Sequence, residues 1–297
     1  MARAGAGAPL RTVALVLGGA LALAAVCYLV FILAYQVRPH SPGAARFTEA
    51  TPAEGLPEAD EAALLELRPA APSLLRLAGQ PGIFVLLFPD LAGQAAAMNR
   101  VAALVEKSGF PRDRLATPAE LAAAISSRGD NANTWYLAHD YAAQSLQQFF
   151  ALADRTSAPL TEAEAWLRQQ LARMEALAGN QGFALLTLSG EPGNQDPAMR
   201  AAMLRHEVAH GWFFTRPAFA TQVNTIWREH MNRTERTALL GFLAREGYDT
   251  ANEELMANEA MAYLAFTPDR RLFRPESLGI SAGRAAALRA LYEAALR

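Results

Sequence analysis

Three residues on one predicted helix have the types and the spacing that can bind a metal ion and use it. His206 and His210 are four positions apart, so on a helix both imidazoles face one side and can reach the same ion. Glu207 lies between them, beside the open coordination position, where it can take a proton from a water molecule. The alternative is a surface helix that carries two solvated histidines. We predict a metal site with His206 and His210 as ligands and Glu207 as general base.

The sequence around this pattern favours a buried helix. Asp196 followed by Pro197 is a typical helix start, one helical run upstream of His206. The face opposite the histidines is apolar, and its side chains are Ala201, Leu204, Val208 and Trp212. Such a stripe buries one side of a helix and leaves the histidines on another side.

A third ligand has to come from elsewhere in the chain. The only cysteine, Cys27, lies inside an apolar run, so the ligand must be a histidine or a carboxylate. The long form of the motif fails, because Phe213 and Arg216 stand where it needs glycine and histidine. Glu259 fits helical register with an apolar stripe, in which a carboxylate is costly to bury unless a cation lies beside it. The alternative ligands are Glu229, His230, Glu253 and Glu254.

The segment Asn258-Glu259-Ala260-Met261-Ala262 resembles the Asn-Glu-x-x-Ala segment of thermolysin-like zinc peptidases, the gluzincins, in which a second helix delivers a glutamate ligand. This resemblance implies a zincin-like domain, Zn²⁺ as the cofactor, and His206, His210 and Glu259 as its ligands. Together the two motifs cover only ten residues of the chain, five in each. The sequence departs from the family at Tyr263, where the familiar segment carries aspartate, and the gap from His210 to Glu259 is longer than in thermolysin.

Further residues are candidates for supporting roles. Tyr263, one turn after Glu259, is our first choice as the donor to the developing oxyanion, with Tyr248 and His230 as alternatives. A plain core aromatic is the other interpretation of Tyr263. The dipeptide His139-Asp140 could form a histidine–carboxylate pair that faces the site, or could be a structural pair.

These residues predict a zinc-dependent peptidase that acts on a peptide or protein substrate, although other amide hydrolysis would use the same site. The net charge of −2 argues against nucleic acid as a partner. One alternative is a non-catalytic, membrane-tethered binding or assembly module with a structural or vestigial metal site. Another is a helical interaction module without metal. Glu207 discriminates against the first alternative, because a structural site does not need a base beside its metal. Elemental analysis of purified protein would separate the second alternative from the other two.

The elements that position these residues predict an α+β, mainly helical fold. Strands are expected at 83–88, 134–138 and 183–188. Helices are expected at 94–107, from Thr117, from Thr161 to about Gly179, from Asp196 to about Trp212, at 218–231, at 234–245 and from Thr250. We divide the chain into a tail (1–11), a transmembrane anchor (12–35), a Pro-, Ala- and acid-rich stalk (36–80), an α/β subdomain (81–178) and a zinc-binding helical subdomain (179–297).

The anchor is predicted from the uncharged run Thr12–Tyr35, which as a helix would be about 36 Å long. A cleaved signal peptide is the alternative, but its apolar region is usually shorter. A short N-terminal tail is more easily retained inside than translocated. We therefore expect an N-terminal transmembrane helix in the bacterial cytoplasmic membrane, with a single pass and an extracytoplasmic catalytic domain.

Overall fold

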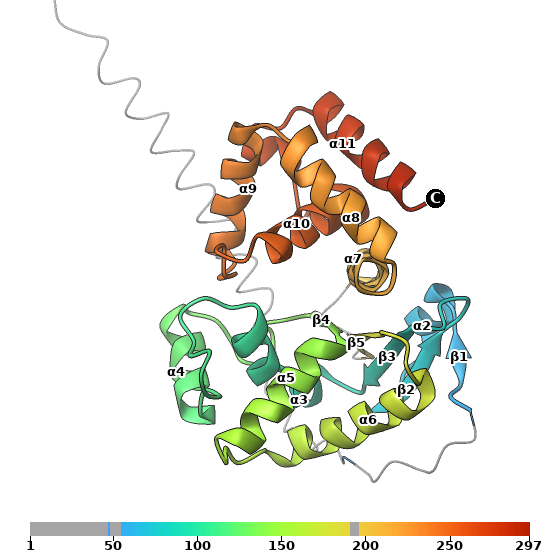
Figure 1. Cartoon of the computed structure of the whole chain (residues 1–297), viewed down its shortest axis with the longest axis vertical. Helices are drawn as coiled ribbons and strands as arrows, with labels where there is room; N and C mark the ends of the chain where they lie inside the picture. Colours follow the sequence, from blue (N-terminus) through green and yellow to red (C-terminus); the bar gives the residue numbers. More distant parts are fainter. Residues whose placement is uncertain (1–46, 48–54, 191–195) are drawn as a thin grey trace, which may run out of the picture. The chain divides into compact units, whose positions relative to one another are not determined.

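A mixed sheet of five strands lies between two layers of helices in the part of the chain that the structure describes (Figure 1). The computed structural model describes Phe47, residues 55–190 and residues 196–297. The strands are β1 (Glu58–Ala59), β2 (Ser73–Leu77), β3 (Ile83–Phe88), β4 (Ala138–Ala142) and β5 (Ala184–Ser189), in the order β1-β2-β3-β5-β4. Strands β1–β2 and β3–β5 pair in parallel, whereas β2–β3 and β4–β5 pair antiparallel.

Strand β3 shows why both faces of the sheet are covered. Its residues are apolar at all six positions, and all six are buried, as the sequence predicted for 83–88. Because successive side chains point to opposite faces, Ile83, Val85 and Leu87 belong to one core cluster. Phe84, Leu86 and Phe88 belong to the other. A strand buried on both sides needs a helical layer on each.

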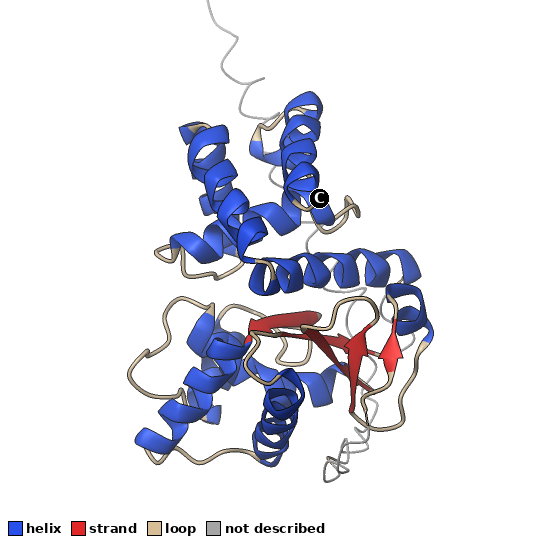
Figure 2. Ribbon diagram, turned by 45° about the vertical axis from the view of Figure 1, so that its right-hand side comes forward, coloured by secondary structure: helices blue, strands red, loops and turns tan. Residues whose placement is uncertain are grey.

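One layer is formed by the helices that lie between β3 and β5 in sequence (Figure 2). They are α3 (Leu91–Val105), α4 (Pro118–Ser127), α5 (Ala143–Arg155) and α6 (Glu162–Ala178). The capping boxes expected at Thr117 with Glu120 and at Thr161 with Glu164 are both present, and they begin α4 and α6.

The other layer begins with α7 (Pro197–Thr215), which packs across β3, β4 and β5. Figure 2 shows α7 between the sheet and the remaining C-terminal helices. These are α8 (Pro217–Thr225), the π-helix η1 (Ile226–His230), α9 (Arg233–Arg245), α10 (Glu253–Met261), the π-helix η2 (Ala262–Phe266), the 3-10 helix η3 (Pro275–Leu278) and α11 (Ala282–Ala295). A short helix, α2 (Glu61–Glu66), also contacts α7.

Local sequence fixes the place of α7. Asp196 caps its first turn by accepting a hydrogen bond from the Ala198 amide at 2.7 Å, and Pro197 occupies the first helical position, as predicted. Gly211 allows α7 to approach the sheet closely, because a Cβ there would lie 2.8 Å from the Ile83 side chain. The helix continues past the predicted end at Trp212 to Thr215.

The predicted fold class, an N-terminal transmembrane helix followed by a zincin-like domain with a few strands, is wrong. The described residues form a mainly helical α+β unit around a mixed five-stranded sheet. No helix among them is both long enough and apolar enough to cross a membrane. The predicted tail (1–11) and anchor (12–35) lie outside the described residues.

The described part of the expected stalk (36–80) belongs to the sheet. Residues 58–77 form β1, α2 and β2, with Leu64 fully buried. Pro57 and Pro72 directly precede β1 and β2, where a proline removes no ladder hydrogen bond, so they mark the strand starts instead of breaking structure. The two predicted subdomains, 81–178 and 179–297, share this sheet, because β5 lies between β3 and β4.

Two predicted boundaries are also wrong. The second strand covers 138–142 and not 134–138, because the rings of Trp135 and Tyr136 instead pack against the Lys107 ammonium group. Helix α10 begins after Asn252, whose side chain accepts from the Leu255 amide, and not after Thr250.

Candidate metal centre

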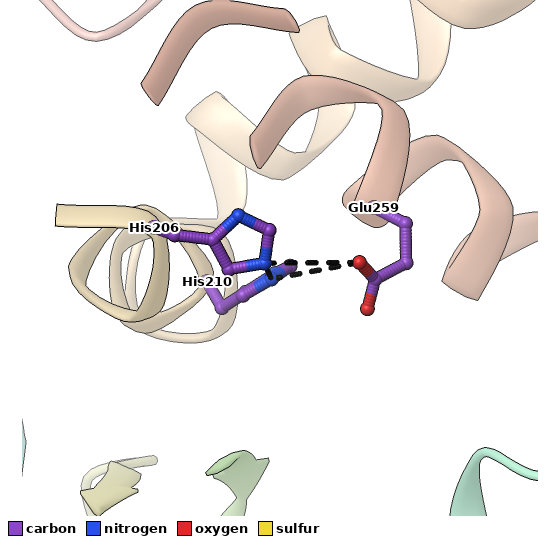
Figure 3. Close-up of side chains that lie close together, drawn as sticks. All are labelled: His206, His210 and Glu259. Atoms are coloured by element: carbon purple, nitrogen blue, oxygen red, sulfur yellow. Dashed lines mark hydrogen bonds and ion pairs between the residues drawn. The ribbon is translucent and has the colours of Figure 1, made fainter. Parts of the chain in front are cut away.

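Two helices bring His206, His210 and Glu259 together (Figure 3). His206 and His210 lie one turn apart on α7, and their Nε2 atoms are 3.0 Å apart. From α10, Glu259 Oε2 lies 3.8 Å from His206 Nε2 and 3.9 Å from His210 Nε2. Ligand atoms about 2.1 Å from a tetrahedral metal ion are separated by roughly 3.4 Å, so all three pairs fit one shared ion. The group can bind a metal ion.

A hydrogen bond that His206 donates to Thr267 sets the orientation of its ring. Thr267 Oγ1 lies 2.7 Å from His206 Nδ1 and 2.9 Å from the Ala262 carbonyl, to which it donates. Because its hydroxyl hydrogen is used there, Thr267 must accept from the Nδ1–H of His206. The lone pair of His206 therefore lies on Nε2, which faces His210 and Glu259.

Glu259 is a buried carboxyl group without a donor to satisfy it. The residue is 2% exposed, and its Oε2 atom has no hydrogen-bond partner among the described residues. Burial raises the pKa of Glu259 to about 8, against the attraction of His210. A cation between the two histidines and Glu259 would satisfy this oxygen and offset the cost of burial. The donor set and the unpartnered oxygen both fit a divalent metal ion.

Glu207 lies beside this group and is not part of it. The residue is 6% exposed, and its Oε2 atom also has no hydrogen-bond partner among the described residues. Burial and the neighbouring carboxyl group of Asp140 raise the pKa of Glu207 well above its usual range. Glu207 is therefore a buried carboxyl group outside the three-residue group, and it interacts electrostatically with Asp140 and Glu259.

Tyr263 lies close to the metal group. Its ring contacts His206 edge to face, with the centroids 4.8 Å apart, and packs on its other sides against Phe242 and Phe273. Burial raises the pKa of Tyr263 well above its usual range, so the phenol keeps its proton and remains a donor.

None of the alternative ligands joins the group. Glu229 and His230 are exposed on η1, and Glu253 and Glu254 are exposed in the first turn of α10. Glu253 instead pairs with Arg228 at 3.1 Å. Across residues 55–190 and 196–297, His206, His210 and Glu259 are the one cluster of potential ligands. Tyr248, an alternative oxyanion donor, has its ring against the Lys107 ammonium group at 4.1 Å.

His139 and Asp140 do not form the pair that the sequence suggested. His139 stacks on Tyr136, with the ring centroids 4.4 Å apart, and its Nδ1 atom lies 3.1 Å from Tyr141 Oη. Burial lowers the pKa of His139 to about 3, so the ring stays neutral. Asp140 points the other way, and its Oδ2 atom lies 3.7 Å from His210 Nε2. Only Asp140 faces the metal group.

Sequence reasoning missed two contributors to the site. Thr267 follows η2, outside both motifs, and nothing in its neighbourhood marks it. Glu106 is a buried acid at the end of α3 whose Oε2 atom accepts from Tyr136 Oη at 2.5 Å. Burial and Asp140 raise the pKa of Glu106 to about 8. The adjacent Lys107 is the only lysine of the chain, and its isolation in an arginine-rich sequence was the available signal.

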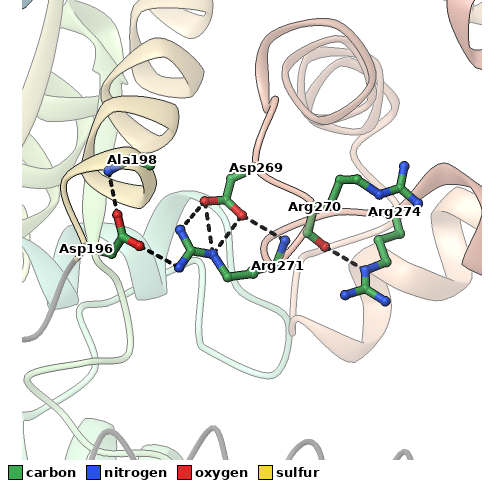
Figure 4. A network of polar contacts seen from close by, with 6 residues as sticks. All are labelled: Asp196, Ala198, Asp269, Arg270, Arg271 and Arg274. Atoms are coloured by element: carbon green, nitrogen blue, oxygen red, sulfur yellow. Dashed lines mark hydrogen bonds and ion pairs between the residues drawn. The ribbon is translucent and has the colours of Figure 1, made fainter.

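An ion-pair network joins the segments that carry the ligands (Figure 4). Arg271 pairs with Asp196 at 2.8 Å and with Asp269. Asp196 caps α7, which carries the histidines, and Asp269 follows Thr267 in the chain. These pairs join the first turn of α7 to the segment that follows η2, although a pair near the surface contributes little to stability by itself.

Comparison of the chain with protein-family models, with curated proteins and with solved structures found no match.

Proposed function

We propose that the protein is a zinc-dependent peptidase in which Glu207 is the general base. The observation that supports this proposal is a group of three potential ligands, His206, His210 and Glu259, beside the buried residue Glu207, whose Oε2 atom has no hydrogen-bond partner among the described residues. Three protein ligands with an open fourth position are typical of catalytic zinc, and a site that only binds zinc has no use for Glu207. The mixed nitrogen and oxygen ligands, without cysteine, also suit Zn²⁺.

Bound zinc would supply a Lewis acid that polarises the scissile carbonyl and makes water a better nucleophile at neutral pH. The residues of the chain would handle the proton. Glu207 takes a proton from the attacking water and passes it to the leaving amine nitrogen as the C–N bond breaks. Tyr263, against His206, is the proposed hydrogen-bond donor to the developing oxyanion.

Two substitutions that differ in position but not in chemistry test the proposal. Glu207→Gln should keep zinc and the fold, because the amide is nearly isosteric and Glu207 is not a ligand, while peptide hydrolysis falls by about 10²–10⁴-fold. Glu259→Gln should instead lose zinc affinity, and activity with it. Glu254→Gln is the matched control on the same helix, since Glu254 is exposed and outside the group.

Zinc content and hydrolysis of a peptide library should be measured for the parent and all three variants. Unchanged hydrolysis in Glu207→Gln would rule out the mechanism. Zinc affinity in Glu259→Gln equal to that of the Glu254→Gln control would remove Glu259 as the third ligand.

A further inference from the structure

The sheet register aims Asp140 at the metal group. Asp140 pairs with Leu186 across the β4–β5 ladder, and side chains of directly opposed residues lie on the same face. Leu186 belongs to the core cluster under α7. Tyr141, which follows Asp140 on β4, belongs to the cluster on the opposite face, as the alternation of side chains along a strand requires. Asp140 therefore points from the edge strand β4 towards α7, where the histidines and Glu207 lie.

Asp140 is a buried acid whose surroundings do not explain it as a structural residue. Its side chain is 14% exposed, and its one ion-pair contact among the described residues is with His210, at 3.7 Å. No arginine or lysine within the described residues pairs with it. Three other acids, Glu106, Glu207 and Glu259, interact with it electrostatically. A carboxyl group in such a place opposes stable folding, which indicates a functional reason for its presence.

The polar partner of Asp140 is Glu207. The carboxyl groups of Asp140 and Glu207 interact directly, so a hydrogen bond can join them when one of the two is protonated. This contact links a residue of the sheet to the residue between the two histidines. Asp140 is not one of the three residues whose ligand atoms lie within 4.8 Å of one another. Its contact with the reaction would therefore run through Glu207.

We propose that Asp140, on the strand β4 that packs against α7, is a positioning residue, which holds the carboxyl group of Glu207 beside the metal group. This inference rests on the proposed role of Glu207 as the base. A glutamate side chain has three rotatable torsions, so a general base on a helix needs a second contact to keep its oxygen near the attacking water. Strand β4, anchored in the sheet, provides a rigid source for that contact.

Two substitutions at one position separate this role from others. Asp140→Ala removes the contact, and kcat should fall by about 10–100-fold, while KM changes little and one zinc per chain is retained. Asp140→Asn keeps a side chain of the same shape that can donate to Glu207, so it should recover most of the lost kcat. Asp154→Ala is the control, because Asp154 is an exposed residue of α5 that pairs with Arg168.

Crystal structures of zinc-loaded parent, Asp140→Ala and Asp140→Asn provide a readout that does not depend on activity. Glu207 should leave its place in Asp140→Ala and keep it in Asp140→Asn. An unchanged Glu207 in Asp140→Ala, or a parental kcat, would overturn the proposal. Loss of zinc from both Asp140 variants would overturn it in favour of a ligand role. If the parent hydrolyses no peptide, the proposed function fails, while the position of Glu207 in the three structures still decides the role of Asp140.

Discussion

Two regions of this molecule bury a glutamate among apolar side chains, but only one of them provides a charged hydrogen-bond partner for it. On the α3–α6 side of the sheet, Glu164 is 1% exposed and lies 2.8 Å from Arg100 Nη1. Arg100 also donates to the carbonyl groups of Ala116 and Pro159, and Glu164 completes a capping box with Thr161. On the α7 side, Glu259 is buried to the same degree, yet its Oε2 atom has no partner among the described residues.

The difference shows how to tell a structural charge from a functional one. The Arg100–Glu164 pair is complete, so its polar atoms contribute to the fold and leave nothing to bind a ligand. The group around Glu259 is incomplete in the absence of a cation, which is a state that folding alone does not favour. A metal ion could complete the second region, whereas the first is complete without one.

The largest expected effect comes from the same substitution made in both regions. Glu164→Gln leaves Arg100 buried without its counter-charge and should reduce the free energy of unfolding by about 3–5 kcal/mol. Glu259→Gln, compared in metal-free protein at pH 8, should not reduce it, because the substitution removes an unpaired buried carboxylate. Urea unfolding of both variants and the parent in the presence of a chelator measures this. Equal destabilisation by the two variants would contradict the comparison.

A smaller effect is expected from the residue that orients His206. Thr267→Val keeps the shape of the side chain but removes the acceptor for His206 Nδ1–H, so zinc affinity should fall by about 10–100-fold. Thr267→Ser retains the hydroxyl group and serves as the control. Competition with a chromophoric chelator gives both affinities. A parental zinc affinity in Thr267→Val would show that the tautomer of His206 does not depend on Thr267.

The smallest effect is a dependence of stability on pH in metal-free protein. Burial raises the pKa of Glu106 and of Glu259 to about 8, and that of Asp140 to about 7. Between about pH 6.5, above which the histidines of the unfolded chain are neutral, and pH 8, the folded state then binds more protons than the unfolded state, so stability falls as pH rises through this window. Added zinc favours the ionised form of Glu259 and should flatten the decline. Urea unfolding at several pH values, with and without zinc, tests this. Stability that rises with pH in the chelated protein would be the contrary result.

The candidate site was largely predictable from sequence because its signals are local. The spacing of His206 and His210 places both on one helix face, and Glu259 interrupts an apolar stripe. Asp140 was singled out, but its direction was not predictable, since it depends on the register of β4 against β5. Thr267 could not be found, because its contact with His206 spans 61 positions in the chain.

The fold was predictable in part for the same reason. The apolar run at 83–88 and the caps at Thr117 and Thr161 determine local structure, and both appear as expected. Strands β1 and β2 were not predicted. The prolines beside them resemble those of a linker, and β1 has only two residues. Pairing partners far apart in sequence decide whether so short a strand forms.

The central claim is that His206, His210 and Glu259 hold one zinc ion, and its most direct test is elemental analysis. Purified protein should be dialysed against zinc, freed of unbound metal and analysed beside a variant with both histidines replaced by alanine. The parent should retain about one zinc per chain, which a chelator removes, and the double variant should retain none. A parent without zinc, or a double variant with as much zinc as the parent, would contradict the account.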